Sequence, residues 1–288
     1  MTSRTVVITG ASTGIGRACA LRLDNKGWTV FAGVRKEQDG VRLENDSSGH
    51  LRSVIVDVTD QESIAAAAKT VSEASNGRGL NALVNNAGIT VQGPLEYLDL
   101  DELRRQFEVN VFGQIAMTQA CLPELRVATG RIVFVSSIAG RAPSLPLIGP
   151  YGASKKALEG LAESLRGELL PWDLPVSLIE PGSIDTPIWE KGDATLEDLI
   201  DDLPEEGRRR YEDALRRGRR LAMSTGRRGI PPEKVAEVVE RALSARRPRL
   251  RYLVGLDARA RAFVEPVIPE FVRERAVRRM LGYEKSEG

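Results

Sequence analysis

The feature that most constrains the fold is the alternation of short, β-branched apolar runs with longer segments of helical periodicity. Such runs stand at residues 5–9, 28–34, 54–58, 82–84, 131–135 and 176–179, and a seventh is expected at 251–254. Their apolar residues are mostly consecutive, whereas a strand with one exposed face alternates apolar and polar residues. Strands buried on both faces and separated by helices predict an α/β protein with a parallel sheet.

Helices are predicted between these strands, at residues 14–26, 61–75, 99–122 and 151–170. The third begins with a capping box, Asp99 followed three residues later by Glu102, and Pro123 is expected to end it. Pro150 and Pro171 bound the fourth.

After Gly182 the chain becomes strongly charged, acidic at first and then basic. We expect residues 183–229 to form a substrate lid of two mobile helices broken at Pro204. The lid belongs to one extended domain, residues 1–255, because a chain of 288 residues suffices for a single large core of this kind. Residues 256–288 are expected to form a basic C-terminal extension packed on or beside this domain. The tail from Arg241 onward is interpreted either as a solvated or inter-subunit face or as a membrane-surface or nucleic-acid element.

Composition excludes several classes of protein. The 41 Lys and Arg residues nearly balance the 40 Asp and Glu residues, so no general electrostatic attraction to nucleic acid is expected. Two cysteines, Cys19 and Cys121, provide neither a disulfide framework nor a metal site. No apolar run approaches the roughly 20 residues of a membrane span, so no integral membrane segment is expected. Because the first strand follows the N-terminus at once, without a leader, a cytoplasmic location is expected.

A glycine-rich segment, TGASTGIG at residues 9–16, joins the first strand to the first helix. Backbone N–H groups and the positive end of the helix dipole at such a junction hold a pyrophosphate. Gly10 permits the turn, Gly14 the close approach of the ligand, and Gly16 the packing of helix on strand. The segment therefore predicts a dinucleotide site, although its spacing differs from the commoner GxGxxG.

The end of the second strand, AGVRK at residues 32–36, indicates which dinucleotide binds. A carboxylate at this point accepts hydrogen bonds from the adenosine ribose and repels a 2′-phosphate, whereas an arginine attracts that phosphate. Arg35 stands here and no acid does, so NADP is predicted over NAD. The alternative is that Arg35 and Lys36 are only a solvated surface pair.

Tyr151 and Lys155 are four residues apart on one predicted helix, so their side chains lie on the same face. Ionising a phenol at neutral pH requires its pKa to fall by about three units, roughly 4 kcal/mol, and a nearby ammonium supports that change. Lys156 points off this face and should matter little. The strand at 131–135 ends in Ser136 and Ser137, which places hydroxyls at the carboxyl edge of the sheet.

Together these segments resemble the short-chain dehydrogenase/reductase family from residue 5 to about residue 190. The matching motifs are TGxxxGIG at 9–16, NAG at 86–88, SSxxG at 136–140, YxxxK at 151–155 and PGxxxT at 181–186. The flanking sequences are most similar to the branch that contains 17β-hydroxysteroid, retinol and 3-hydroxybutyrate dehydrogenases. The resemblance implies a Rossmann-like, doubly wound sheet of seven parallel strands in the order 3-2-1-4-5-6-7, with a C-terminal helical extension.

The family's functional residues carry over onto matching positions. Catalysis is expected from Asn110, Ser137, Tyr151 and Lys155, with Asn110 holding a water that links Lys155 to solvent. The expected cofactor contacts are Gly10, Ser12, Thr13, Gly14, Ile15, Gly16, Arg35, Asp57, Val58, Asn86, Ala87, Gly88, Tyr151, Lys155, Pro181, Gly182, Ile184 and Thr186. Asp57, placed at the end of the third strand, is expected to bind the adenine amino group. The interval from Ser137 to Tyr151 is 14 residues, one more than relatives usually show.

The resemblance implies an NADP-preferring oxidoreductase that transfers a hydride between the nicotinamide and a secondary alcohol or ketone, or a primary alcohol or aldehyde. The apolar residues 145–148 suggest a lipophilic substrate such as a steroid, a retinoid or a fatty derivative. One alternative is a non-catalytic NADP-binding sensor or scaffold, and another is an NAD-dependent dehydrogenase of a small hydroxy acid. The helices at 99–122 and 151–170 match those through which relatives assemble, so a homodimer or homotetramer is expected.

Overall fold

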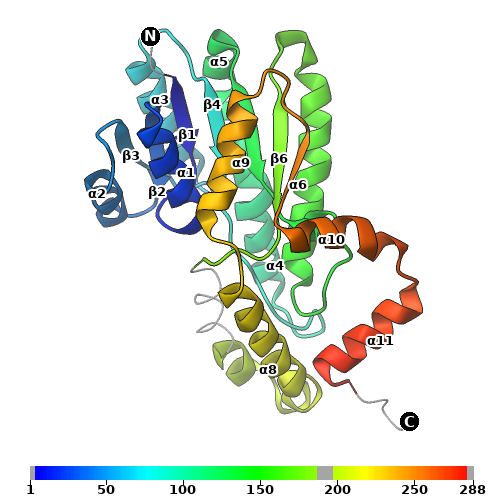
Figure 1. The fold of residues 1–288 in the computed structure, drawn as a ribbon. Coiled ribbons are helices and arrows are strands. Elements are labelled where there is room, and N and C mark those ends of the chain that lie inside the picture. Colours follow the sequence, from blue (N-terminus) through cyan, green and yellow to red (C-terminus); the bar gives the residue numbers. More distant parts are fainter. Residues whose placement is uncertain (1–3, 187–196, 284–288) are drawn as a thin grey trace.

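The computed structural model of the protein describes residues 4–186 and 197–283. Its centre is a sheet of seven parallel strands in the order β3-β2-β1-β4-β5-β6-β7 (Figure 1). The strands are β1 (Thr5–Ile8), β2 (Thr29–Val34), β3 (Leu51–Ile55), β4 (Ala82–Asn85), β5 (Arg131–Val135), β6 (Val176–Pro181) and β7 (Arg251–Val254). The predicted α/β class and strand order are confirmed.

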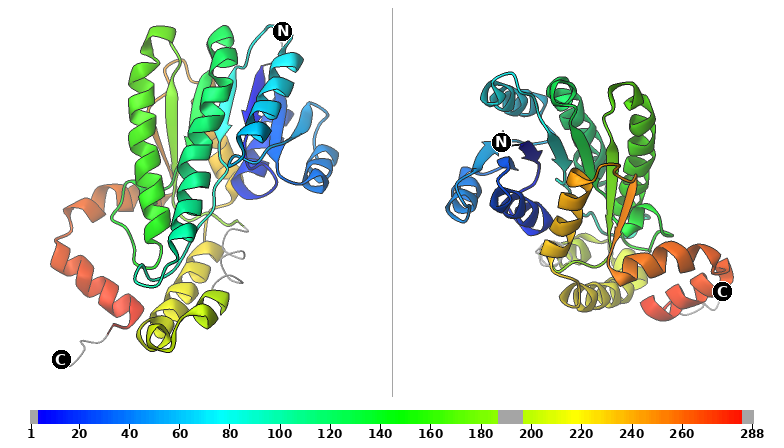
Figure 2. Two further views of the ribbon diagram at one scale, coloured as in Figure 1. Left: turned by 180° about the vertical axis from the view of Figure 1, so that it is seen from behind. Right: turned by 45° about the horizontal axis from the view of Figure 1, so that its top comes forward.

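Helices cover both faces of this sheet, as Figures 1 and 2 show. On one face lie α1 (Gly14–Asn25), α2 (Glu37–Asn45) and α9 (Pro232–Ser244). On the other lie α3 (Gln61–Ser75), α4 (Leu100–Phe107), the π-helix η1 (Glu108–Phe112), α5 (Gly113–Ala128) and α6 (Gly149–Glu168). Two apolar cores, one on each side of the sheet, hold these layers together.

The third strand lies three residues earlier than predicted. It spans Leu51–Ile55, not residues 54–58, and is an edge strand that pairs only with β2. Val56 and Val58 are buried beyond its end, so they extend the apolar run without extending the strand. Asp57 therefore follows β3 by two residues and does not close it. The sequence also gave no sign of α2, which is charged and buries only Gly40 and Leu43.

The predicted helix at 99–122 is wrong at its C-terminal end. The Asp99 carboxylate does cap α4, accepting from the Asp101 N–H, and the helix then passes through η1 into α5, which continues past Pro123 to Ala128. A proline inside a helix removes one hydrogen bond and crowds the preceding turn. Burial of Met117, Cys121 and Leu125 in the core outweighs that cost.

The charged region after β6 is helical on both sides of Pro204, as predicted. Residues 197–202 are helical, and α8 (Glu205–Arg227) follows Pro204, whereas lid residues 187–196 lie outside the described residues. The basic extension consists of α10 (Leu256–Val264), the 3₁₀ turn η4 (Glu265–Val267) and α11 (Glu270–Leu281). Figure 1 shows α8 and α11 beyond the carboxyl ends of the strands.

The parts of the chain that the structure describes lack two further features. They contain no helix that is both long and apolar enough to cross a membrane. They also contain no cluster of three or more His, Cys, Asp or Glu side chains arranged to hold a metal ion.

Candidate active site

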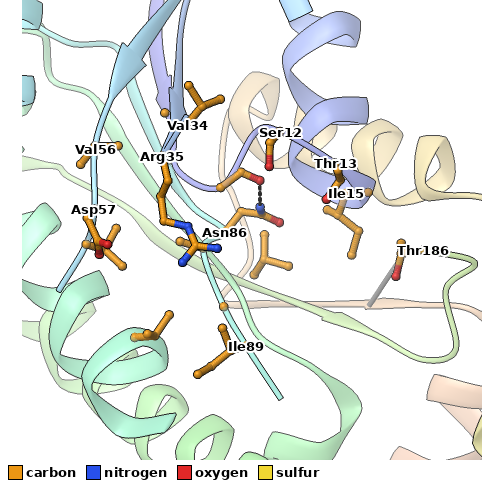
Figure 3. A pocket seen from close by; sticks show the side chains of 18 of the residues that line it. Ser12, Thr13, Ile15, Val34, Arg35, Val56, Asp57, Asn86, Ile89 and Thr186 are labelled. Atoms are coloured by element: carbon orange, nitrogen blue, oxygen red, sulfur yellow. Dashed lines mark hydrogen bonds between the residues drawn. The ribbon is translucent and has the colours of Figure 1, made fainter. Parts of the chain in front are cut away.

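A cavity of about 330 Å³ opens at the carboxyl edge of the sheet, where β1 and β4 are neighbours and the strand order reverses (Figure 3). Ligands of doubly wound sheets bind at this switch point. The structure brings these predicted residues to its wall: Gly10, Ser12, Thr13, Gly14, Ile15, Arg35, Asp57, Val58, Asn86, Ala87, Gly88, Tyr151, Lys155 and Thr186. Residues outside the set of expected cofactor contacts also line it: Gly33, Val34, Lys36, Asp39, Val56, Ile89, Val109, Val135 and Ser136.

The glycine loop has the geometry that an anion site requires. Gly10 and Gly14 have φ angles of 65° and 56°, in the left-handed region that favours glycine. A Cβ on Gly16 would lie 2.2 Å from the Gly10 carbonyl oxygen, so only glycine fits there. The α1 helix begins at Gly14, and its first turn has neither an acidic residue nor a side-chain cap from Thr13. Gly14 and Ile15, the first residues of this helix, line the cavity, so their backbone N–H groups lie there without a side-chain acceptor from the cap, which suits the phosphates of a dinucleotide.

Asn86 ties the glycine loop to the end of β4. Its Nδ2 donates to the carbonyl oxygens of Thr9 and Gly10, both at 3.0 Å, and one of these bonds is drawn in Figure 3. In return, the Thr9 hydroxyl accepts from the backbone N–H groups of Asn86 and Ala87, each at 3.0 Å. The sequence motif predicted Asn86 as a cofactor contact. It did not predict that buried Thr9 holds the loop, because that contact joins two segments 77 residues apart.

The side chains at the ends of β2 and β3 meet at one end of the cavity. Figure 3 shows the Arg35 side chain directed into it, with Asp57 on the neighbouring wall. Hydrogen bonds from the backbone and hydroxyl of Thr59 hold the pKa of Asp57 below its usual value, and the positive charge of Arg35 adds to this effect. Asp57 is therefore ionised at neutral pH and available as an acceptor beside a cation.

Tyr151 and Lys155 line the cavity from the first turns of α6. The Lys155 Nζ lies 5.8 Å from the centre of the Tyr151 ring and donates to the Val135 carbonyl oxygen at 2.8 Å. Burial lowers the pKa of Lys155 to about 8, while Glu159 opposes that change. Burial raises the pKa of Tyr151, and the Ser137 hydroxyl partly offsets the rise. Both side chains line the cavity from one face of α6, as their four-residue spacing predicted.

Ser137 and Asn110 flank this pair and do not form part of the cavity wall. The Ser137 Oγ accepts from the Ala139 N–H at 3.2 Å. Asn110 lies in the π-helix η1, a distortion that is common at functional sites. Its Nδ2 donates to the Ile89 carbonyl and to the Ser154 Oγ, and its Oδ1 accepts from the Ile89 N–H at 2.9 Å. Asn110 thereby connects the segment after β4 to the helix that carries Tyr151 and Lys155.

Of the described residues in the segment after β6, Thr186 is the one that lines the cavity. Of the other predicted contacts there, Pro181 and Ile184 are buried and Gly182 packs against the Asp257 carboxylate. The Asp257 carboxylate also accepts from the Ser183 N–H at 2.6 Å, an anchor that the sequence did not reveal.

Lys156, which was expected to point away from the catalytic face, makes a contact of its own. Its Nζ donates to the Ala142 carbonyl oxygen at 2.7 Å, which tethers the loop between β5 and α6. In that loop Leu147 has a φ of 67°, a left-handed conformation that is uncommon for a residue with a side chain.

Comparison with known families agrees with this geometry. A family model described as short chain dehydrogenase matches residues 4–197. The chain belongs to this family. The family binds NAD(P), and the relatives described below are named as dehydrogenases and reductases. The chain is therefore an NAD(P)-dependent oxidoreductase.

Similar proteins place this short chain dehydrogenase in the retinol and steroid branch that its sequence resembles. It is 37% identical to retinol dehydrogenase 5 of Mus musculus and to 17-beta-hydroxysteroid dehydrogenase type 6 of Bos taurus, each over 88% of this chain and 81% of the relative. It is 34% identical to an NADPH-dependent 3-dehydrocapnine reductase of Ornithobacterium rhinotracheale, over 88% of both chains.

Solved structures show the same fold. A short-chain dehydrogenase from Streptomyces avermitilis has a TM-score of 0.74 at 28% identity, covering 98% of this chain and 95% of its own. A short chain dehydrogenase from Burkholderia cenocepacia in complex with NADP has a TM-score of 0.69 at 25% identity, covering 98% of both chains.

Proposed function

We propose that this short chain dehydrogenase uses NADP(H) to interconvert a lipophilic alcohol and the corresponding ketone or aldehyde. One observation carries the proposal: Tyr151 and Lys155 line the same cavity as the uncapped glycine loop and Arg35. When bound there, the nicotinamide coenzyme accepts a hydride from the alcohol or donates one to the carbonyl. The chain's own residues then have to bind the coenzyme, orient the substrate and move one proton.

We assign the proton transfer to Tyr151. In oxidation its oxygen takes the proton of the substrate hydroxyl, and in reduction its hydroxyl returns that proton to the carbonyl oxygen. The raised pKa of Tyr151 keeps the proton on the phenol at neutral pH, which suits the donor role. Ser137 is assigned to hydrogen-bond the substrate oxygen, and the Lys155 ammonium to stabilise the phenolate. Asn110 is assigned to hold the helix that carries them.

The preference for NADP rests on the charges at the end of β2. Arg35 and Lys36 both line the cavity, and position 34 is valine where a carboxylate would disfavour a 2′-phosphate. One acid, Asp39, also lines this end, but it lies in the first turn of α2 with the Arg42 guanidinium 4.0 Å away. The NADPH-dependent reductase among the relatives and the NADP complex among the solved structures support the same choice.

The proposed lipophilic substrate rests on the surroundings of the lid. In its described part, Ile200, Leu203 and Leu215 form a buried apolar cluster, against which Tyr97 and Leu147 pack. Leu147 belongs to the loop that precedes Tyr151, so the lid docks beside the proposed catalytic groups through apolar contacts. Relatives named for retinol and 17-beta-hydroxysteroids support a substrate of this class.

We further propose the division into one domain, residues 1–255 with the lid at 183–229, and an extension, residues 256–288, packed on it. The packing of Ala258 and Ala262 in α10 against Ile138 and Ala142 supports this arrangement. We also propose a homodimer or homotetramer formed through the α4–α5 and α6 helices, where Leu161 is 42% exposed.

The proposal is tested by screening alcohols and carbonyl compounds, including retinoids, steroids and small hydroxy acids, with both coenzymes by nicotinamide absorbance. NADP(H)-dependent turnover of a lipophilic compound is expected. Tyr151→Phe should lower turnover by about 10² or more, the usual contribution of a positioned acid–base group, and leave NADPH binding nearly unchanged. Full activity of Tyr151→Phe would refute the assigned chemistry.

Lys155→Ala should lower turnover and also weaken coenzyme binding. Because Lys156 holds the loop before α6, the matched control is Lys234→Ala, an exposed lysine on α9 that pairs with Glu237. NADPH binding without turnover of any compound would instead support a sensor, and NAD-dependent turnover of a small hydroxy acid would support the other alternative.

A further inference from the structure

A cluster of charged side chains lies directly behind the catalytic end of β5, outside the cavity wall. We call Glu159, Glu180 and Arg251 the acid cluster. They come from α6, β6 and β7, and the side chains of Glu159 and Glu180 are 6% and 0% exposed. Carboxylates are seldom buried to this extent without a function or a full set of partners.

The acid cluster has more negative than positive charge at close range. The Arg251 Nε lies 3.0 Å from a Glu180 oxygen and 3.3 Å from a Glu159 oxygen, so one guanidinium serves two buried carboxylates. The next cation, Arg141, is 4.0 Å from Glu180. Glu163, one turn further along α6, also contacts Arg251 but is 48% exposed. Within the described residues, neither oxygen of Glu180 has a hydrogen bond, whereas Glu159 accepts one from the Ser136 Oγ and one from the Arg251 Nε.

Glu159 connects this cluster to the catalytic groups in two ways. It follows Lys155 by four residues on α6, so both side chains lie on the same face of the helix. Its Oε1 accepts a hydrogen bond from Ser136 Oγ at 2.9 Å, and Ser136 is the residue before Ser137. A Cβ on Gly140 would lie 2.8 Å from the Glu159 Oε1 and 3.0 Å from Ser136 Oγ, so no side chain separates these groups.

The end of β5 is thus held by two side chains of one helix. Lys155 binds the carbonyl of Val135, and Glu159 binds the hydroxyl of Ser136. We propose that Glu159 is a positioning residue, which fixes the end of β5 through Ser136 and keeps the Lys155 side chain charged. This inference rests on the roles proposed above for Lys155 and Ser137.

The charges that face Glu159 agree with this role. They are Lys155 and Glu163 from α6, Glu180 from β6, Arg251 from β7 and Arg141 from the segment after η2. Burial raises the pKa of Glu159, while Ser136 and Arg251 oppose the rise and stabilise the carboxylate. That carboxylate in turn opposes the fall in the pKa of Lys155.

The test separates the charge of Glu159 from its hydrogen bond. Glu159→Gln removes the charge and retains an oxygen for Ser136, whereas Glu159→Asp retains the charge on a side chain too short to reach it. Glu163→Gln is the matched control, because it removes a carboxylate from the same helix and the same arginine without touching Ser136. The pKa of Lys155 is measured in the full chain without coenzyme, by carbon NMR of labelled lysine side chains, with the Lys155 signal assigned by its loss in Lys155→Ala.

In Glu159→Gln the pKa of Lys155 should fall below its wild-type value by roughly one pH unit, as expected for loss of a nearby opposite charge. It should change little in Glu159→Asp or Glu163→Gln. Once a substrate is known, turnover by Glu159→Gln should be about 10-fold below wild type at pH 9, because a smaller fraction of Lys155 is charged in the variant. At pH 6 the loss should be much smaller, because Lys155 is charged in both proteins. Glu159→Asp should lose turnover to a similar degree at both values.

An unchanged pKa of Lys155 in Glu159→Gln, or an equal fall in Glu163→Gln, would overturn the proposal. If Glu159→Gln does not fold, Ser136→Ala and Glu159→Asp test the proposal instead. Turnover at the wild-type rate in both variants would overturn the proposal. The NMR measurement needs no turnover, so a fall confined to Glu159→Gln in a protein without activity would refute the proposed function alone. If the wild type is active and Tyr151→Phe loses turnover, but Glu159→Gln, Glu159→Asp and Ser136→Ala do not, this inference is refuted and the proposed function is not.

Discussion

Glu180 gives the protein a specific dependence of stability on pH. It is completely buried near the C-terminal end of β6, and burial, reinforced by the charge of Glu159, raises its pKa to about 7. In the unfolded chain the same carboxyl titrates near 4.5. The folded state therefore binds this proton more tightly, and the stability that the proton provides is lost as the pH rises from about 4.5 to about 7.

The size of the effect follows from that difference. A change of about 2.5 in pKa corresponds to about 3 kcal/mol at 1.36 kcal/mol per pH unit. Glu180→Gln replaces the carboxyl with a neutral group of the same shape, which approximates protonated Glu180 at every pH. Near pH 5 the free energies of unfolding of the variant and the wild type should differ by less than about 1 kcal/mol, because the unfolded carboxyl is only partly protonated there. Near pH 8 the variant should be more stable by up to about 3 kcal/mol.

The measurement is urea unfolding of both proteins between pH 5 and pH 8, followed by circular dichroism. Groups common to both proteins cancel in the difference between their free energies of unfolding. Glu163→Gln serves as the control, since Glu163 is exposed and contacts the same Arg251, and its difference should vary little with pH. A difference for Glu180→Gln that stays constant from pH 5 to pH 8 would refute the argument.

Three further predictions concern binding and assembly. Val34→Asp combined with Arg35→Ala should move the coenzyme preference toward NAD by about 2 to 4 kcal/mol in kcat/KM, the contribution of about two charge-assisted contacts. A wild type that already prefers NAD would contradict the role assigned to Arg35. Asp257→Ala removes the acceptor of the Ser183 N–H and should weaken NADPH binding severalfold in a fluorescence titration, with the exposed Glu270→Ala as control. Light scattering should give a dimer or tetramer mass at micromolar concentration, and Leu161→Glu should reduce it; a monomer mass for the wild type would reject the assembly.

Four apolar residues at helical spacing, Leu158, Leu161, Ala162 and Leu165, lie on α6, one of the helices expected to mediate assembly. Leu158 and Ala162 of α6 are fully buried in the core, and Leu165 is partly buried against it. Periodicity marks the apolar stripe of a helix, but it does not distinguish a stripe that faces the sheet from one that faces a second chain. Leu161 is the exposed member of this group.

Local sequence determined the fold and most of the cavity wall. The alternation of apolar runs and helical segments predicted the parallel sheet, because burial on both faces requires continuous apolar strands. The glycine loop and the four-residue spacing of Tyr151 and Lys155 are also local, since one turn or one helix sets their geometry. The ends of individual elements were predicted less well. The apolar run ending at Val58 placed the end of β3 too late, and Pro123 placed the end of α5 too early.

Only the tertiary structure decided which charges share a buried volume. In the sequence, Glu180 is an acid before a proline, and Arg251 begins a short strand 71 residues later. The neighbouring positions of β6 and β7, with α6 packed against them, bring both side chains to Glu159 and so to the end of β5. A pKa depends on every charge within a few ångströms and on the water that packing excludes, and neither quantity is encoded in local periodicity.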